Sequence, residues 1–230
     1  MYVEKTLAKF KKDKSYEYFP GNTIIHFIKN SSQIQILTEI QNEMSQYPLF
    51  NKFVLLPTDS YHMTVCDLLT YADLFSNERY TNFKHKNLSH ILDIDNQIYR
   101  DLGKEFFELH ITMVPVAIQS KKVVLRPKSK EDEMKLVEFR EFISKKIGFT
   151  INPNYTFHIS LAYQLQELTP NEKSEMDYIL SKLNEKYLSS LGDIIIDEAV
   201  LALFNDMSEY RAYSYGRDSL GVAEISYIKI

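Results

Sequence analysis

Three segments of the chain share one pattern, in which apolar residues alternate with a histidine and a hydroxyl residue. They are Tyr61–Val65, Leu109–Met113 and Phe157–Leu161, and each reads apolar-His-apolar-Ser/Thr-apolar. Six histidines would give about one His-x-Ser/Thr match by chance. Alternation with a period of two places successive side chains on opposite faces of a β-strand. We therefore expect three strands, each with its histidine and hydroxyl on one face and its apolar side chains on the other.

Strand-like and helix-like segments alternate along the chain. Short apolar runs bounded by turn residues predict strands, and apolar residues three or four positions apart predict helices. Because no change in composition marks a linker, we expect one domain over residues 1–230 with an α+β fold, and the lysine-rich residues 1–17 as a polar N-terminal extension. We expect strands at 22–28, 53–56, 61–66, 105–118, 123–125, 155–163, 194–204, 211–215 and 222–230, and helices at about 31–44, 91–102, 133–148 and 170–188.

Composition excludes several classes of protein. The chain is 44% hydrophobic with 30 Phe and Tyr residues (14 and 16), which is typical of a globular domain with a large aromatic core. A net charge of −4 argues against binding long duplex DNA, so an anionic substrate needs a local basic patch. No segment approaches the roughly 18 apolar residues of a membrane span, and the first residues lack the apolar core of a secretory signal. Cys66 is the only cysteine, which favours a reducing, cytoplasmic location.

The paired histidines indicate acid–base chemistry. An imidazole titrates near neutral pH, so one ring can take a proton while another gives one, and each role accelerates a reaction by about 10²- to 10⁴-fold. Neighbouring hydroxyls can donate hydrogen bonds to phosphate oxygens as negative charge builds on them. We therefore predict a phosphodiesterase site that needs neither metal nor cofactor. Its catalytic residues are His62 and His158, and its phosphate-binding residues are Thr64 and Ser160.

These residues resemble the two-histidine (2H) phosphoesterases, which include 2′-5′ RNA ligase-like proteins and cyclic nucleotide phosphodiesterases. The strings Pro20–His26, Ser60–Val65 and Phe204–Met207 are similar to one branch of that superfamily, and the likeness spans residues 18 to 215. It implies a bilobal fold, with two pseudosymmetric antiparallel-sheet lobes flanked by helices around a central groove. It also implies a nucleotide or short RNA substrate carrying a cyclic, 2′,3′-cyclic or 2′-5′ phosphodiester.

His110 is the rival for either catalytic role. Glu108 lies two residues before it on the same strand face, where Ser60 and Thr156 precede the other two motif histidines. A carboxylate there would repel a phosphate, so we favour the pair without His110. Three further residues are candidates to line the groove or contact substrate, namely His26, Tyr163 and Arg211, although packing is the commoner role for a histidine such as His26.

Other interpretations remain open at this level. Cys66 shares a predicted strand face with His62, but nothing indicates the base and orienting acid that a thiol nucleophile needs. The basic run from Lys121 to Lys130 is typical of a solvated edge, and would hold further phosphates only if it bordered the groove. The same groove could serve a nucleotide- or RNA-binding module without turnover, or join RNA ends as a ligase does. We expect a monomer.

Overall fold

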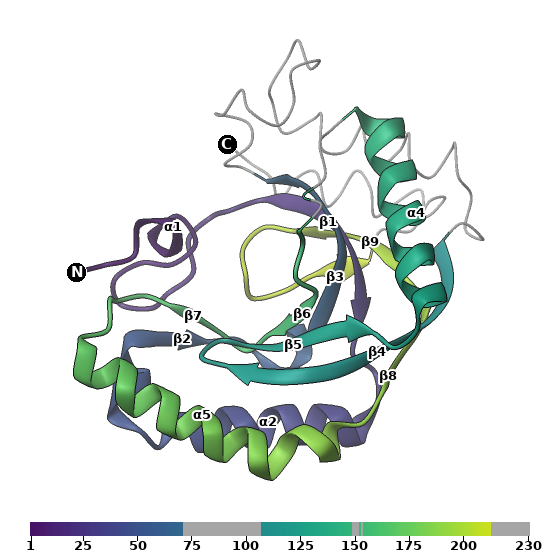
Figure 1. The fold of residues 1–230 in the computed structure, drawn as a ribbon. Helices are drawn as coiled ribbons and strands as arrows, with labels where there is room; N and C mark the ends of the chain where they lie inside the picture. The colour runs from purple at the N-terminus through teal and green to yellow at the C-terminus, as the bar shows by residue number, and fades with distance from the viewer. Residues whose placement is uncertain (71–106, 149–151, 153, 213–230) are drawn as a thin grey trace.

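The computed structural model describes residues 1–70, 107–148, 152 and 154–212 of the chain (Figure 1). The helix expected at 91–102 and the strand expected at 222–230 lie outside the described residues, as do most of 211–215 and the start of 105–118. The strands are β1 (Gly21–Phe27), β2 (Phe53–Leu55), β3 (His62–Thr70), β4 (Glu108–Gln119), β5 (Lys122–Pro127), β6 (His158–Ser160), β7 (Ala162–Gln164), β8 (Ile194–Glu198), β9 (Val200–Phe204) and β10 (Arg211–Ala212). The α-helices are α1 (Glu4–Leu7), α2 (Ser31–Ser45), α4 (Lys130–Ile147) and α5 (Pro170–Leu191), with short 3-10 helices at η1 (Pro48–Lys52) and η2 (Thr58–Ser60).

Most of the described strands form one curled antiparallel sheet, which agrees with the predicted α+β class. Its eight strands run in the order β10-β9-β1-β3-β6-β5-β4-β8, and β2 and β7 form a separate pair. Consecutive strands β8 and β9 lie near opposite ends of this order with only Ala199 between them, so the sheet must curl to bring its ends together. The peptide NH of Ala199 donates to the carbonyl of Phe107 (2.8 Å) at this crossing. The single strand expected over 194–204 is therefore two strands on different parts of the sheet.

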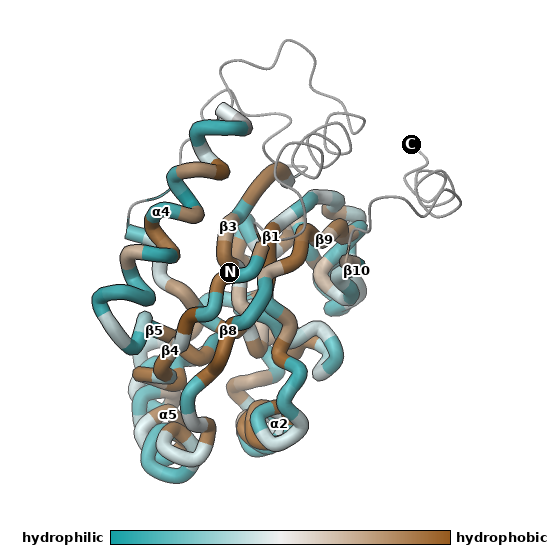
Figure 2. Tube along the Cα trace, turned by 90° about the vertical axis from the view of Figure 1, so that its right-hand side faces the viewer, coloured by the Kyte–Doolittle hydropathy of each residue, from teal (hydrophilic) through white to brown (hydrophobic). Residues whose placement is uncertain are grey.

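Among the described residues, three long helices cover the sheet. Helices α2 and α5 lie side by side below it, and α4 runs along β4 and β3 (Figure 1). Hydrophobic segments concentrate in strands β1, β3, β8 and β9, while α4 alternates between hydrophilic and hydrophobic turns (Figure 2). This alternation is typical of helices that pack one face on a core and expose the other to water. None of the helices that the structure describes combines the length and apolar character needed to span a membrane.

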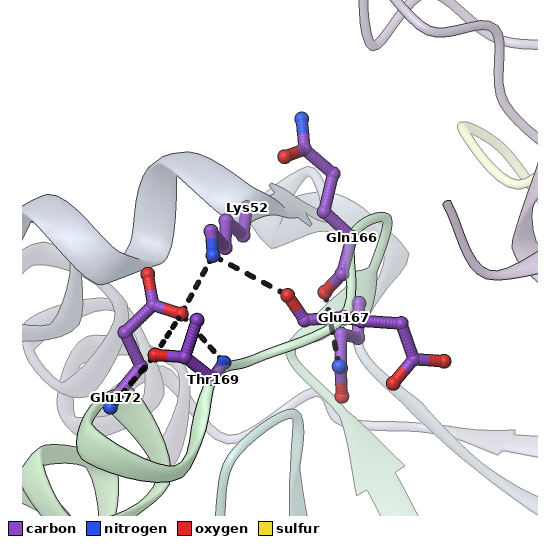
Figure 3. Close-up of polar contacts among 6 residues, drawn as sticks. Lys52, Gln166, Glu167, Thr169 and Glu172 are labelled. Atoms are coloured by element: carbon purple, nitrogen blue, oxygen red, sulfur yellow. Dashed lines mark hydrogen bonds and ion pairs between the residues drawn. The ribbon is translucent and has the colours of Figure 1, made fainter. Parts of the chain in front are cut away.

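Polar caps fix where α5 begins. The Thr169 side chain accepts from the peptide NH of Glu172, and the Glu172 carboxylate accepts from Thr169 in return, while Pro170 occupies the first turn. Lys52 lies 2.6 Å from the same carboxylate and 3.3 Å from the carbonyl of Glu167 (Figure 3). The hydrogen bonds from Lys52 and Thr169 lower the pKa of Glu172 to about 2. The predicted start of this helix at Pro170 is thus confirmed. The structure adds a contact that the sequence did not predict, from Lys52 of η1 to the capping residue Glu172.

The predicted strand over 155–163 is also interrupted. Strand β6 ends at Ser160, and the peptide NH groups of the next two residues, Leu161 and Ala162, both donate to the carbonyl of Lys121 (2.8 and 3.1 Å). The buried amide of Gln41 in α2 donates to the carbonyl of Leu161 as well (2.6 Å). With its backbone bound from two sides, the chain leaves the large sheet after Ser160 and continues as β7 beside β2.

Residues 1–19 pack against the body of the domain and are not the polar extension that their lysines suggest. The peptide NH of Val3 donates to the carbonyl of Leu165 (3.0 Å), and Tyr2 forms a β-bridge with Gln166. Phe10 is fully buried in a second apolar cluster whose other members come from β2, from the β7 region and from the segment after β9. Figure 1 shows this purple segment beside β7. The segment therefore buries an apolar face, which its lysine-rich composition did not indicate.

Candidate functional site

Two of the three His-x-Ser/Thr segments lie side by side on antiparallel strands, β3 and β6. Met63 of β3 pairs with Ile159 of β6, and both side chains are fully buried in the main core. Residues on either side of such a pair project from the opposite face of the sheet. Each motif histidine therefore lies opposite the hydroxyl residue of the other motif, which gives this seam an approximate two-fold symmetry. The four residues on this face are His62, Thr64, His158 and Ser160.

These four side chains line one pocket of about 180 Å³, which we call the seam pocket. Tyr163, Tyr210 and Lys9 also line it, so β7, the β9–β10 connection and the N-terminal segment complete its wall. Asp67 is the carboxylate among its described lining residues. This volume is small compared with typical sites for drug-sized ligands, about 300 to 1,000 Å³.

The two imidazoles are held in the same way. Nδ1 of His62 lies 2.7 Å from the carbonyl oxygen of Ser60, and Nδ1 of His158 lies 2.7 Å from that of Thr156. In both cases the acceptor belongs to the residue two positions earlier. Because a carbonyl oxygen only accepts hydrogen bonds, Nδ1 must carry the hydrogen in each ring. Nε2 is therefore the nitrogen of each ring that can take up and release a proton.

Burial keeps both rings neutral at pH 7. The side chain of His62 is only 8% exposed, and burial lowers its pKa from 6.5 to about 4, with a smaller contribution from the nearby His158. The half-buried His158 also has a lowered pKa, mainly because of burial and further because of the charges on Lys122 and Lys121. Charged imidazolium is costly in such surroundings, so both free rings are predominantly unprotonated at neutral pH.

Each histidine packs against a tyrosine. The ring of Tyr210 lies 4.2 Å from that of His62 between centroids, and the ring of Tyr155 stacks on His158 at 6.3 Å and 29°. Tyr155 also forms a hydrogen bond with Thr64, so it contacts both motifs. Burial raises the pKa of both tyrosines, so each hydroxyl stays protonated at any ordinary pH. The rings limit how far the imidazoles can turn and how much water reaches them.

A buried arginine in α4 contacts both strand β3 and the ring of Tyr155. Arg140 of α4 is 4% exposed, donates to the carbonyl of Val65 on β3 (2.8 Å), and lies 4.5 Å from the ring centroid of Tyr155. Such a cation–π contact is worth about 2 kcal/mol when it is desolvated. Arg140 therefore connects helix α4 to Tyr155 and, through it, to both motifs. Nothing in the local sequence around Arg140 indicated this role, since the contacts join residues far apart in the chain.

Lys122 brings positive charge to the seam. It pairs directly with Ser160 across β5 and β6, and paired residues on antiparallel strands project from the same face. Its charge acts on His158, and burial lowers its own pKa. The sequence identified the basic run but not which member approaches the motif, because this depends on the register of β5 against β6.

Comparison with known proteins supports the resemblance to the two-histidine phosphoesterases. Residues 9–96 match the family model 2H-phosphodiest, described as a domain of unknown function (DUF1868). No curated protein sequence matches the chain significantly. Among solved structures, the conserved protein of unknown function ATU0111 from Agrobacterium tumefaciens superposes with a TM-score of 0.79 at 19% identity, over 93% of this chain and 92% of that chain. E. coli LigT in its apo form gives 0.50 at 11% identity, over 86% of this chain and 96% of that chain.

This chain has the two-histidine phosphoesterase fold. A Kluyveromyces marxianus Usb1 structure with uridine monophosphate gives a TM-score of only 0.44 at 10% identity, over 85% of this chain and 98% of that chain. The resemblance expected from the sequence is confirmed, together with the α+β class. The match to the family model contains the first motif, whereas the second motif at His158 lies beyond it. In this two-histidine phosphoesterase fold, the two motifs meet only through the β3–β6 pairing.

Not every candidate residue lies at the seam. Tyr163 lines the seam pocket, whereas His26 and Arg211 are not among its described lining residues. His26 pairs with Met63 and so projects from the face opposite to His62, where its Nδ1 contacts the carbonyl oxygen of Glu198 (2.9 Å). Arg211 is exposed on β10 and contacts Glu209 (3.0 Å).

Cys66 is fully buried in the main core and does not line the pocket. The register of β1 against β3 shifts between Ile24 and Ile25, which pair with Cys66 and Thr64, so the simple alternation ends there. The next residue, Asp67, lines the seam pocket, whereas Cys66 does not. The shared face expected for Cys66 and His62 was therefore wrong, because an irregular pairing breaks the period of two.

His110 lies in a different pocket, of about 480 Å³, which we call the acidic pocket. Its Nδ1 lies 3.6 Å from Asp197 and its Nε2 lies 3.8 Å from Glu108, and the side chain is 65% exposed. The two-histidine phosphoesterase fold thus separates the third motif from the other two. Over the described residues, no group of three or more His, Cys, Asp or Glu side chains is arranged to hold a metal ion.

Proposed function

We propose that this chain is a phosphodiesterase that hydrolyses a cyclic or 2′-5′ phosphodiester of a nucleotide or short RNA by acid–base catalysis at the seam pocket. The observation that carries the proposal is the antiparallel pairing of two His-x-Ser/Thr motifs with identical Nδ1 anchors. Two imidazoles and two hydroxyls line one pocket as a result, which supports the proposed roles. That set matches what cleavage of a phosphodiester by water requires.

His62 is the base and His158 the acid in the proposed reaction. His62 is the more deeply buried ring, and its pKa of about 4 keeps Nε2 unprotonated at neutral pH. His158 is more accessible to solvent, and a bound phosphate anion would favour its protonated form, because an opposite charge nearby raises the pKa of an imidazole. The two environments thus separate the two roles, as acid–base pairs in enzymes commonly require.

The proposed chemical step balances as follows. Nε2 of His62 takes a proton from water while the water oxygen forms a bond to phosphorus. The bond from phosphorus to the leaving ribose oxygen breaks, and Nε2 of His158 gives its proton to that oxygen. The hydroxyls of Thr64 and Ser160 donate to the nonbridging oxygens as charge develops on them, and Lys122 adds positive charge beside Ser160. Proton exchange with solvent then restores the starting state of both rings.

The decisive experiment is product formation in excess chelator. The panel contains 2′,3′-cyclic nucleotides, a 2′-5′ oligoadenylate and cyclic dinucleotides, incubated with the wild-type chain and with the double variant His62→Ala/His158→Ala. We expect chelator-resistant turnover of at least one substrate by the wild type alone. Turnover that the chelator abolishes would overturn the metal-independent mechanism. Substrate-induced stabilisation without any product would instead indicate a binding module, and joined RNA ends would indicate a ligase.

A further inference from the structure

Lys9 belongs to the wall of the seam pocket although it comes from the N-terminal segment, far in sequence from both motifs. Its Nζ lies 3.5 Å from the hydroxyl of Tyr163, 4.8 Å from the centroid of that ring, and 5.1 Å from the ring of Phe19. The two rings hold the ammonium group at the pocket, since cation–π contacts favour a cation over an aromatic face. Within the described part of the chain, no carboxylate forms an ion pair with it.

Aromatic rings and a sulfur atom line the pocket between His62 and Lys9. From His62 the wall runs through Tyr210, whose hydroxyl lies 3.6 Å from Sδ of Met207, and on to Tyr163, whose hydroxyl lies 3.5 Å from the same sulfur. Lys9 lies at the far end of this series of contacts. The pocket therefore has a histidine end and a lysine end, with flat apolar surface between them.

The electrostatics of the histidines agree with this separation. Burial is the main cause of the lowered pKa of both His62 and His158, and the lysine charges that lower the pKa of His158 further are those of Lys122 and Lys121. The charge that adds to the effect of burial on His62 is that of His158. Lys9 is not among the charges that shift the pKa of either ring. A phosphate bound at the histidines is thus served by Lys122 and the two hydroxyls, which leaves Lys9 for another group.

We propose that Lys9 binds a second anionic group of the substrate, a phosphate monoester separate from the phosphodiester that is cleaved. The substrate class is then a nucleotide that carries both groups, such as a nucleoside 2′,3′-cyclic phosphate with a 5′-phosphate. The nucleoside would lie along Tyr210, Met207 and Tyr163, where a base or sugar finds apolar contact. This inference rests on the proposed function for the position of the first phosphate.

The test compares adenosine 2′,3′-cyclic phosphate with and without a 5′-phosphate as substrates of the wild type, Lys9→Met and Lys12→Met. Methionine keeps the length of the lysine stem and removes its charge, so it preserves packing on Phe19 and Tyr163. Lys12 is the matched control, because it comes from the same segment and lies over the ring of Tyr2, outside the described lining of the pocket. We expect the wild type and Lys12→Met to prefer the 5′-phosphorylated substrate by about tenfold in kcat/KM, and Lys9→Met to lose that preference.

A wild type without this preference, or a Lys9→Met variant that keeps it, would overturn the proposal. Binding distinguishes this failure from a failure of the proposed function, because it requires no turnover. Calorimetry should show that adenosine 2′,5′-bisphosphate binds the wild type about tenfold more tightly than adenosine 2′-phosphate, and that Lys9→Met removes the difference. Such binding without turnover of any substrate would support the Lys9 site and refute the catalytic proposal. Equal binding of both ligands by the wild type would refute the Lys9 site.

Discussion

The seam pocket and the acidic pocket each contain a histidine from a His-x-Ser/Thr segment, but they surround it with opposite chemistry. At the seam, His62 and His158 are withdrawn from solvent, each with a carbonyl on Nδ1 and a tyrosine against the ring. In the acidic pocket, His110 is exposed between the carboxylates of Glu108 and Asp197. The same five-residue pattern therefore supplies a candidate catalyst in one place and a surface histidine in another.

The difference arises from the position of each strand in the sheet. Strands β3 and β6 lie in its interior, so a second motif faces the first, whereas β4 has β8 as its outer neighbour at the sheet's end. His110 has a backbone φ of 47°, an uncommon value for a non-glycine residue, and it lies where the pairing of β4 with β8 is irregular, between Glu108 and Ile111. The seam thus differs from the acidic pocket in having a partner strand with a second motif, burial and a nearby cation.

The largest expected effect separates the three histidines by activity. Replacing His62 or His158 by alanine should lower kcat/KM by about 10²- to 10⁴-fold on any substrate that the wild type hydrolyses, because each variant removes one proton-transfer group. His110→Ala is the matched control and should stay within about twofold of wild type, since its pocket is separate. Steady-state kinetics on purified variants with unchanged melting temperatures would check this. A loss in His110→Ala as large as in the other two would end the distinction between the pockets.

The second expected effect is on stability, and its cause is the burial of His62. Its pKa is about 4 in the folded chain and 6.5 in an ordinary setting, so between these values the unfolded chain binds a proton that the folded chain does not. The free energy of unfolding should therefore fall as pH falls from 6.5 to 4, by up to about 3 kcal/mol from this group, and level off below pH 4. Urea unfolding of the wild type and His62→Gln across this range would measure it. Parallel curves for the two proteins would contradict the burial effect.

A third, smaller effect tests the charges of the two pockets. Lys122→Met removes the cation paired with Ser160 and should lower kcat/KM by about tenfold, with weaker dependence on salt, because a charge-assisted contact to phosphate is lost. Glu108→Gln removes a carboxylate of the acidic pocket and should change kcat/KM by less than twofold. Measuring kcat/KM of the wild type and both variants at low and high ionic strength would check these expectations. If Glu108→Gln raised activity as much as Lys122→Met lowered it, a long-range field rather than local contact would be responsible.

The smallest expected effect concerns the tyrosine that contacts both motifs. Tyr155→Phe keeps the ring on His158 and removes the hydrogen bond with Thr64, so we expect a loss of a few-fold in kcat, of the order of one hydrogen bond. Tyr178→Phe is the control, because Tyr178 is exposed on α5 and does not line either pocket. Unchanged kcat in Tyr155→Phe would show that packing alone holds Thr64.

The local elements of the fold could be read from the sequence because they depend on neighbouring residues. Alternation predicted the strands at His62 and His158, and the residues Thr169-Pro170 predicted the start of α5. Two breaks were missed, at Leu161 and at Ala199. At both, the carbonyl of a residue distant in the chain accepts a hydrogen bond from the backbone, that of Lys121 or Phe107. Such contacts leave no local pattern.

The sequence by itself determined which side chains carry proton-transfer and hydroxyl chemistry, and that each motif presents them on one strand face. That follows from the period of two, which is a property of any extended backbone. Only the tertiary structure decided which motifs meet, because pairing depends on the order and register of strands that are distant in the chain. It also decided that Lys9, Tyr210 and Arg140 reach the seam and that His26 does not. Burial set the lowered pKa values, since solvation of a side chain depends on everything packed around it.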